Sequence, residues 1–175
     1  MRVVTGGILH PLAAYLLHRG LQTLPIRVEA AQTSAVELAK RLGRHPSVER
    51  VFFPGLADCD PLKLVGRQMA GPGSLVAFEV RGGREMAGRV LESVRLMTPA
   101  VSLGSTDTLI QHPAGLTHHV VPAEDRECCG ISENLIRVSV GLEDVDDLWD
   151  DLAGALTLAS RAEAHSSVWL NDLRL

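Results

Sequence analysis

Three stretches organise this chain of 175 residues: Val101-Ser102-Leu103-Gly104, Thr108-Leu109-Ile110-Gln111-His112-Pro113 and Leu135-Ile136-Arg137-Val138-Ser139-Val140-Gly141. In the third stretch, apolar side chains alternate with Arg137 and Ser139, which predicts a short β-strand closed by a glycine. The arginine of such a strand faces away from the core, and a strand fixes its direction. Because a guanidinium is a rigid planar fork that binds a carboxylate through two hydrogen bonds, Arg137 is a candidate anion-binding residue.

A structural interpretation of Arg137 competes with this one. Glu133 and Asp144 lie nearby in the sequence, and an arginine at such a position is commonly solvated or forms a surface ion pair. The spacing of these residues alone favours the structural interpretation.

The rest of the sequence predicts helices and strands without a regular β–α–β rhythm. Periodicity and capping residues predict helices at 12–22, 27–41, 60–69, 84–93 and 145–158, and strands at 47–53, 74–80 and 94–97. Residues 104–131 are predicted to form a loop. This order predicts an α+β fold in which an antiparallel or mixed sheet carries helices on one face.

Composition limits the class of protein. With 46% hydrophobic and 22% charged residues, the chain can bury one sizeable core. A net charge of −4 predicts neither nucleic acid nor an anionic membrane as a partner. No apolar run is long enough to span a bilayer, no secretory signal opens the sequence, and the three cysteines suit reduced thiols, so we expect a cytoplasmic protein.

The segment after Gly104 also holds residue types that bind zinc, namely His112, His118, His119, Cys128 and Cys129. Adjacent pairs of ligands tend to point apart, whereas a structural zinc site needs four converging ligands at wider spacings. No feature of the sequence, such as a position at a helix N-terminus, indicates that either cysteine is an activated thiolate. The sequence therefore predicts neither a metal site nor a catalytic cysteine.

A resemblance favours the functional interpretation of Arg137. The runs AVSLGSTDTLIQHPAGLTHHVVP and CCGISENLIRVSVGLEDVDDLWDDL, together with GGILHPLAAYLLHRGLQTLPIRV and RQMAGPGSLVAFEV upstream, closely resemble the cysteine/methionine-metabolism family of pyridoxal-phosphate enzymes. That family contains cystathionine γ-synthase, the cystathionine lyases and methionine γ-lyase. The resemblance covers residues 6–158 and implies that Ser102 and Arg137 hold the α-carboxylate of an amino-acid substrate.

The resemblance also implies further substrate-binding residues, Val101, Leu103 and Thr117. Enzymes of the family that handle cystathionine commonly have glutamate at the position of Val101, whereas methionine γ-lyase has valine, so we expect a sulfur-containing or γ-substituted substrate with an apolar γ-substituent. The loop departs from the family pattern at Ser105, Asp107 and Leu116.

The family resemblance implies the small C-terminal domain of a fold-type I pyridoxal-phosphate enzyme. The expected division is a lead-in and interdomain helix at 1–25, the small domain at 26–159 and an extra tail at 160–175. The helix at 12–22 is apolar on more than one side, as a helix between two domains would be. Trp169 in the tail suits either a frayed end or a docking segment.

Members of the family attach the cofactor to the lysine of a Ser-x-Thr-Lys segment in a large N-terminal domain. Here the only lysines are Lys40 and Lys63, and neither matches that motif. We therefore expect no catalytic or cofactor-binding residue in this chain, and pyridoxal 5'-phosphate only in a complex with a lysine-bearing partner chain. This predicts the C-terminal half of a split lyase or transferase that is inactive alone. The alternatives are a non-catalytic binding or regulatory module and a truncated remnant of such an enzyme.

Overall fold

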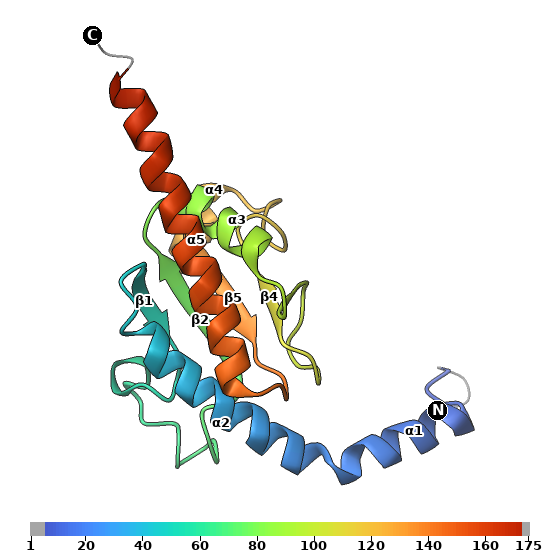
Figure 1. Cartoon of the computed structure of the whole chain (residues 1–175). Coiled ribbons are helices and arrows are strands. Elements are labelled where there is room, and N and C mark those ends of the chain that lie inside the picture. The colour runs from blue at the N-terminus through green and yellow to red at the C-terminus, as the bar shows by residue number, and fades with distance from the viewer. Residues whose placement is uncertain (1–5, 173–175) are drawn as a thin grey trace.

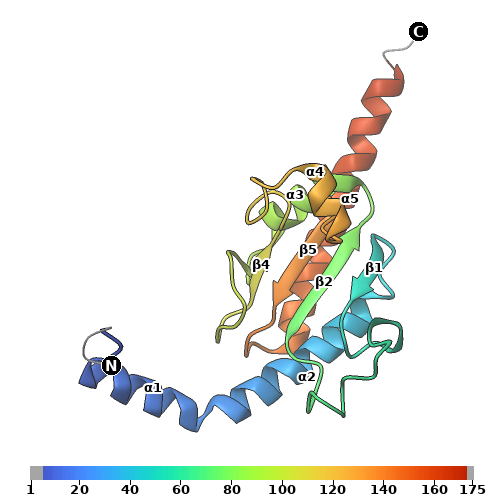
Figure 2. The same cartoon turned by 180° about the vertical axis from the view of Figure 1, so that it is seen from behind.

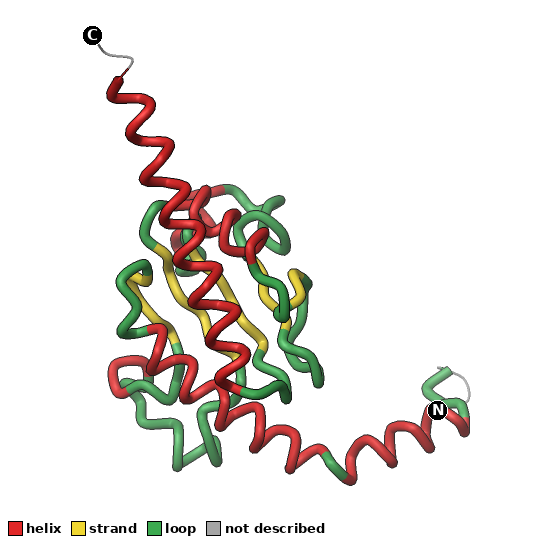
Figure 3. The backbone as a smooth tube through the Cα atoms, viewed as in Figure 1, coloured by secondary structure: helices red, strands yellow, loops and turns green. Residues whose placement is uncertain are grey.

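The computed structural model describes the backbone of residues 6–172 and the side chains of residues 6–162. The elements in chain order are α1 (Pro11–Gln22), α2 (Leu24–Leu42), β1 (Val48–Phe52), the short 3-10 helix Ala57–Cys59, β2 (Leu75–Val80), α3 (Gly83–Ser93), β3 (Thr98–Pro99), β4 (Leu109–Gln111), α4 (Ala123–Cys128), β5 (Leu135–Ser139) and α5 (Val145–Asp172). Figure 3 shows which parts of the backbone are helix, strand and loop.

The strands form one mixed sheet in the order β1-β2-β5-β4-β3. Every neighbouring pair is antiparallel except β3 and β4, which run parallel. The predicted α+β fold with a mixed sheet is therefore confirmed. The strand β5 lies in the middle of the sheet, so its side chains are flanked by those of β2 and β4.

The helices α2, α3 and α5 lie against one face of the sheet, as Figure 1 and the reverse view in Figure 2 show. Alternation along β5 sends Ile136 and Val138 into this layer, where they join a buried cluster with Leu148 and Leu152 of α5. Burying each such side chain contributes about 1.5–3 kcal/mol. Because side chains alternate along a strand, Arg137 lies on the opposite face, away from these helices.

The predicted strand at 94–97 is wrong, and the strand of this region, β3, begins directly after it at Thr98. The backbone N–H groups of Arg95, Leu96 and Met97 donate to the two carboxylate oxygens of Asp151 on α5, at 2.8, 3.0 and 2.9 Å. Three consecutive N–H groups that point to one carboxylate cannot alternate as they do in a strand. A contact more than fifty residues away in sequence therefore decides this segment.

The predicted helix at 60–69 is also wrong. The Asp60 carboxylate accepts hydrogen bonds from the backbone N–H groups of Leu64 and Val65, at 2.8 and 2.9 Å, and these bonds lower the pKa of Asp60. Lys63 and Gly66 take left-handed backbone angles, with φ of 51° and 85°, which a right-handed helix excludes. Asp60 thus stabilises a turn instead of beginning a helix.

The segment 104–131 is not entirely loop, since it contains β4 and α4. At the ends of the chain, α1 and the C-terminal part of α5 extend from the body of the domain (Figure 1), and none of the residues of α1 is buried. The predicted tail continues α5 up to Asp172, and the side chain of Trp169 lies outside the described residues. None of the described helices combines the length and the apolar character needed to cross a bilayer.

Candidate functional site

Arg137 lies at the middle of the central strand β5, on the face of the sheet opposite the helices. Its register partners are Ala77 of β2 on one side and Gln111 of β4 on the other. The small side chain of Ala77 leaves room beside the guanidinium, whereas Gln111 is 1% exposed and fills the other side. The sequence alternation that predicted the direction of Arg137 is therefore confirmed.

Ser102 lies beside Arg137, on the loop that follows β3. The guanidinium Nη2 of Arg137 donates to the backbone carbonyl oxygen of Ser102 at 2.8 Å. The Ser102 hydroxyl oxygen accepts from the backbone N–H of Gly104 at 3.1 Å, and among the described residues no acceptor takes its proton. The structure thus brings together the two residues that the resemblance assigned to one carboxylate, with a serine proton available to a ligand.

Arg137 forms neither of the two ion pairs that the structural interpretation named. Glu133 pairs with Arg126 and Arg84, and Asp144 accepts from the backbone N–H of Asp146. In the described part of the chain no carboxylate pairs with Arg137. Burial lowers the pKa of Arg137, because desolvation disfavours its charged form. A partly buried guanidinium without an anion is suited to receive one from a ligand.

The carboxylate of Glu143, which follows β5 in the sequence, fixes the loop that carries Ser102. Both oxygens of Glu143 accept hydrogen bonds from Thr108, one from its backbone N–H and one from its hydroxyl, each at 2.7 Å. The Thr108 hydroxyl oxygen in turn accepts from the backbone N–H of Gly141 at 2.8 Å. A Cβ at Gly141 would lie 2.4 Å from the carbonyl oxygen of Thr106, so this close approach requires glycine. The sequence analysis missed this arrangement, since its members lie 33 and 35 residues apart.

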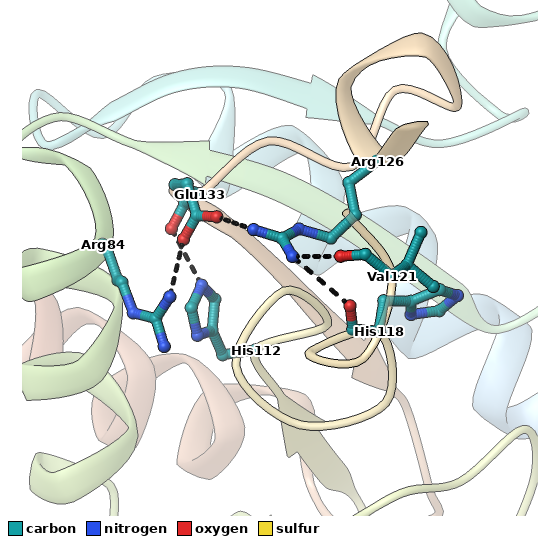
Figure 4. Close-up of polar contacts among 6 residues, drawn as sticks. All are labelled: Arg84, His112, His118, Val121, Arg126 and Glu133. Carbon is teal, nitrogen blue, oxygen red and sulfur yellow. Dashed lines mark hydrogen bonds and ion pairs between the residues drawn. The ribbon is translucent and has the colours of Figure 1, made fainter. Parts of the chain in front are cut away.

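A second polar cluster fixes the segment between β4 and β5, and Figure 4 shows its side chains pointing toward one another. Glu133 pairs with Arg126 of α4 and with Arg84 of α3, and its backbone carbonyl oxygen lies 2.8 Å from His112 Nε2. Arg126 also donates to the carbonyl oxygen of Val121 at 2.6 Å. Its guanidinium lowers the pKa of Glu133. Sequence analysis gave these residues no such role, because only the fold brings them together.

The remaining predicted substrate-binding residues take two positions. Val101 and Leu103 flank Ser102, and both are exposed. Leu103 lines a surface hollow with both apolar and polar residues of α2, among them Leu24, Arg27 and Val28. Thr117 lies on the segment before α4, where its hydroxyl oxygen is 2.8 Å from His118 Nδ1. A role for Thr117 with Arg137 therefore stays a prediction.

The histidine and cysteine side chains considered as zinc ligands do not converge on one point. Among residues 6–162, no group of three or more histidine, cysteine or acidic side chains is placed to hold a metal ion. Cys128 and Cys129 are both exposed at the end of α4.

Neither lysine fits a covalent attachment site near Arg137. Lys40 is exposed on α2, in the helix layer and therefore on the other side of the sheet from Arg137. Lys63 is exposed in the connection between β1 and β2. The arrangement of this chain can hold a carboxylate, and it offers no lysine beside that carboxylate.

Comparisons with known proteins place this chain in a family. Residues 1–157 match the protein family described as Cys/Met metabolism PLP-dependent enzymes. The L-methionine gamma-lyase of Brevibacterium sandarakinum is 54% identical over 164 residues, which are 94% of this chain and 40% of that protein. The L-methionine gamma-lyase of Streptomyces avermitilis is 53% identical over 156 residues, which are 89% of this chain and 33% of that protein. This chain thus spans two fifths or less of the length of these relatives.

Solved structures show the same likeness. A crystal structure of a cystathionine gamma lyase (CalE6) from Micromonospora echinospora superposes with a TM-score of 0.83 and 41% identity, over 89% of this chain and 41% of the other. A structure of apo CalE6, there named a methionine gamma lyase, superposes with a TM-score of 0.80 and 42% identity over the same shares.

Proposed function

The chain belongs to the family of Cys/Met metabolism PLP-dependent enzymes, and from this premise we propose that it is the substrate-carboxylate-binding part of a C–S lyase. The observation that carries the proposal is the position of Arg137. Its guanidinium lies beside Ser102 without a carboxylate partner among the described residues. Arg137 and the Ser102 hydroxyl would together hold the α-carboxylate of an amino acid and fix its orientation.

The family depends on pyridoxal phosphate, and the residues of this chain do not fit its covalent attachment. Lys40 and Lys63 are exposed, and Lys40 lies across the sheet from Arg137. We propose that a second polypeptide supplies the lysine and the phosphate site, so that the active protein is a heteromer. This chain would then correspond to the C-terminal part of its longer relatives, as the resemblance implied.

The proposed substrate is an amino acid with an apolar, sulfur-containing side chain. Val101 offers no carboxylate to a distal ammonium group, and a buried charge partner would discriminate far more strongly than one methylene group. Elimination at the γ-carbon, as the names of the relatives state for them, is the proposed reaction class.

A second candidate function is a binding or regulatory module that captures an amino acid without chemistry. The absence of a suitable lysine favours this function over an enzyme that acts alone. The two candidates share Arg137 and differ in whether a lysine-bearing partner is needed. A truncated remnant would need neither Arg137 nor a lysine-bearing partner.

The test reconstitutes this chain with the part of the Brevibacterium sandarakinum relative that it does not match. Release of a thiol from methionine by the mixture, and by neither part alone, would support the split enzyme. Arg137→Ala should weaken substrate capture by about 2–5 kcal/mol, because removal of a buried charge-assisted pair costs that much. Arg137→Lys should weaken it less, since lysine keeps the charge and loses the planar fork.

Arg95→Ala is the matched control. The Arg95 side chain is exposed, and the residue bonds to Asp151 through its backbone N–H, which the substitution keeps. Unchanged KM in a folded Arg137→Ala complex would refute the proposal. Binding of methionine by the chain without any partner, abolished by Arg137→Ala, would instead establish the binding module.

The isolated chain should not hold pyridoxal phosphate covalently, because neither Lys40 nor Lys63 fits an attachment site. Incubation with the cofactor, borohydride reduction and peptide mass spectrometry measure this directly. Stoichiometric modification of one lysine at equimolar cofactor would contradict the expectation, and bovine serum albumin treated in parallel sets the level of nonspecific modification.

A further inference from the structure

We propose that Gln111 is a positioning residue that sets the plane of the Arg137 guanidinium and thereby the orientation of the bound carboxylate. This inference deepens the proposed function and rests on it. Gln111 is 1% exposed, and its backbone lies directly opposite Arg137 in the antiparallel pair β4 and β5. A positive charge close by stabilises a buried amide oxygen, and the neighbouring guanidinium supplies that charge.

The distances show where the amide lies. With its oxygen oriented toward Arg137, that oxygen is 3.0 Å from Nε, 3.2 Å from Nη1 and 2.6 Å from Nη2. A point in the plane of a guanidinium can approach only two of its nitrogens this closely. The amide oxygen therefore lies over the flat face of the guanidinium and not at its edge.

This position has a consequence for ligand binding. The N–H bonds of a guanidinium point outward in its plane, and a carboxylate binds bidentately at an edge. Nη2 donates one hydrogen bond to the carbonyl oxygen of Ser102 at 2.8 Å, and the amide oxygen of Gln111 lies against the flat face of the guanidinium. The remaining in-plane N–H groups stay available to a carboxylate. Gln111 thus fixes the fork without occupying the edge that binds.

The chain supports Gln111 rigidly. It lies within β4, which is bonded to β5 on one side and to β3 on the other. Ile110 before it is fully buried in the core, so β4 cannot slide or rotate freely. His112 after it is held by the carbonyl oxygen of Glu133 at 2.8 Å. Because the strand is anchored on both sides of Gln111, the place from which its side chain reaches Arg137 is fixed.

The first arm of the test needs no partner and no substrate. In the full chain, a held guanidinium rotates slowly, and the Nη groups of Arg137 should give separate ¹H–¹⁵N signals, assigned by their loss in Arg137→Lys. Gln111→Met keeps the length of the side chain and removes the oxygen, so the signals should merge. Gln111→Glu keeps an oxygen at the same place, so they should stay separate. Merged signals in the wild type, or separate ones in Gln111→Met, would overturn the inference.

The second arm measures substrate capture in the reconstituted complex. Gln111→Met should raise the KM for methionine about tenfold or more, as expected for loss of a polar contact to a charged group, with a smaller effect on kcat. Gln111→Glu should restore most of the affinity. In an Arg137→Lys background, Gln111→Met should have no further effect, because the two residues act as one unit. Additive effects in this cycle would mean a general structural role and would overturn the inference.

The two arms separate the inference from the proposed function. A wild-type complex that neither binds nor cleaves an amino acid would refute the proposed function, and the spectra alone would then decide the role of Gln111. A complex that depends on Arg137 while ignoring Gln111→Met would refute the inference and leave the proposed function intact.

Discussion

At the scale of single residues, Arg126 and Glu133 form the ion pair with the most buried partner in the described part of the chain. The Arg126 side chain is 10% exposed and that of Glu133 is 39% exposed. The carboxylate also pairs with Arg84 at 3.0 Å, so it contacts two guanidinium groups. Removing Glu133 would leave a buried positive charge without a partner, which costs more than the pair itself contributes.

The Arg126 guanidinium holds the pKa of Glu133 below its ordinary value of 4.5. A carboxyl group whose pKa is lowered by folding contributes stability that is present above its unfolded pKa and is lost as the pH falls through its folded pKa. Glu133→Gln should therefore reduce the free energy of unfolding at neutral pH, and the difference from wild type should shrink in acid, below about pH 4. Urea unfolding at a series of pH values measures both effects.

Glu127→Gln on the exposed surface of α4 controls for the change of net charge. An equal difference between wild type and Glu133→Gln at every pH would show that the carboxylate charge plays no part in the stability.

At the scale of elements, the link between α5 and the segment before β3 matters most for the site. Asp151 of α5 accepts the three backbone N–H groups of residues 95–97, and β3 and then Ser102 follow. Because α5 packs on the helix face and Ser102 lies near Arg137 on the other, this carboxylate connects the core to the loop. The position of Ser102 thus depends on a residue far from any ligand.

Asp151→Asn should lower the free energy of unfolding by about 1–2 kcal/mol, because an amide has one acceptor oxygen where the carboxylate offered two. Hydrogen exchange at the amides of residues 95–97 should accelerate in parallel. Asp150→Asn, one position earlier on the exposed side of α5, is the matched control. Unchanged protection of these amides in Asp151→Asn would contradict the role assigned to the carboxylate.

At the scale of the whole molecule, α1 and the first turns of α2 present apolar side chains to solvent. Leu12, Tyr15, Leu16, Leu17 and Leu21 are each more than half exposed, and no residue of α1 is buried. Apolar surface of this extent usually marks an interface. The same helix is the one that the sequence predicted as interdomain, so we expect the proposed partner chain to cover it.

The chain without its partner should therefore self-associate through α1. Leu16→Gln should weaken that association about tenfold or more, because burying one leucine contributes about 1.5–3 kcal/mol, and it should leave the thermal unfolding temperature nearly unchanged. Sedimentation velocity over a range of concentrations measures the association. Leu158→Gln, a half-exposed leucine on α5, is the control. A wild-type chain that sediments as a monomer at all concentrations would count against this interface.

Local patterns in the sequence determined much of this protein. The period-2 alternation at 135–140 predicted β5 and the direction of Arg137, and the helical periodicity predicted α1, α2, α3 and α5, since both patterns depend on residues a few positions apart. The motif around Ser102 and Arg137 indicated the family. These inferences needed no knowledge of which elements meet.

Only the tertiary structure decided the contacts between distant residues. In the structure, the backbone of residues 95–97 binds Asp151 instead of forming the predicted strand at 94–97. Glu143 contacts Thr108, and Gln111 contacts Arg137. A hydrogen bond acts over about 3 Å in space, and no spacing along the chain records which residues the fold brings within that distance. The sequence therefore determined the strand that carries Arg137, whereas the packing of β4 beside β5 decided what holds its guanidinium in place.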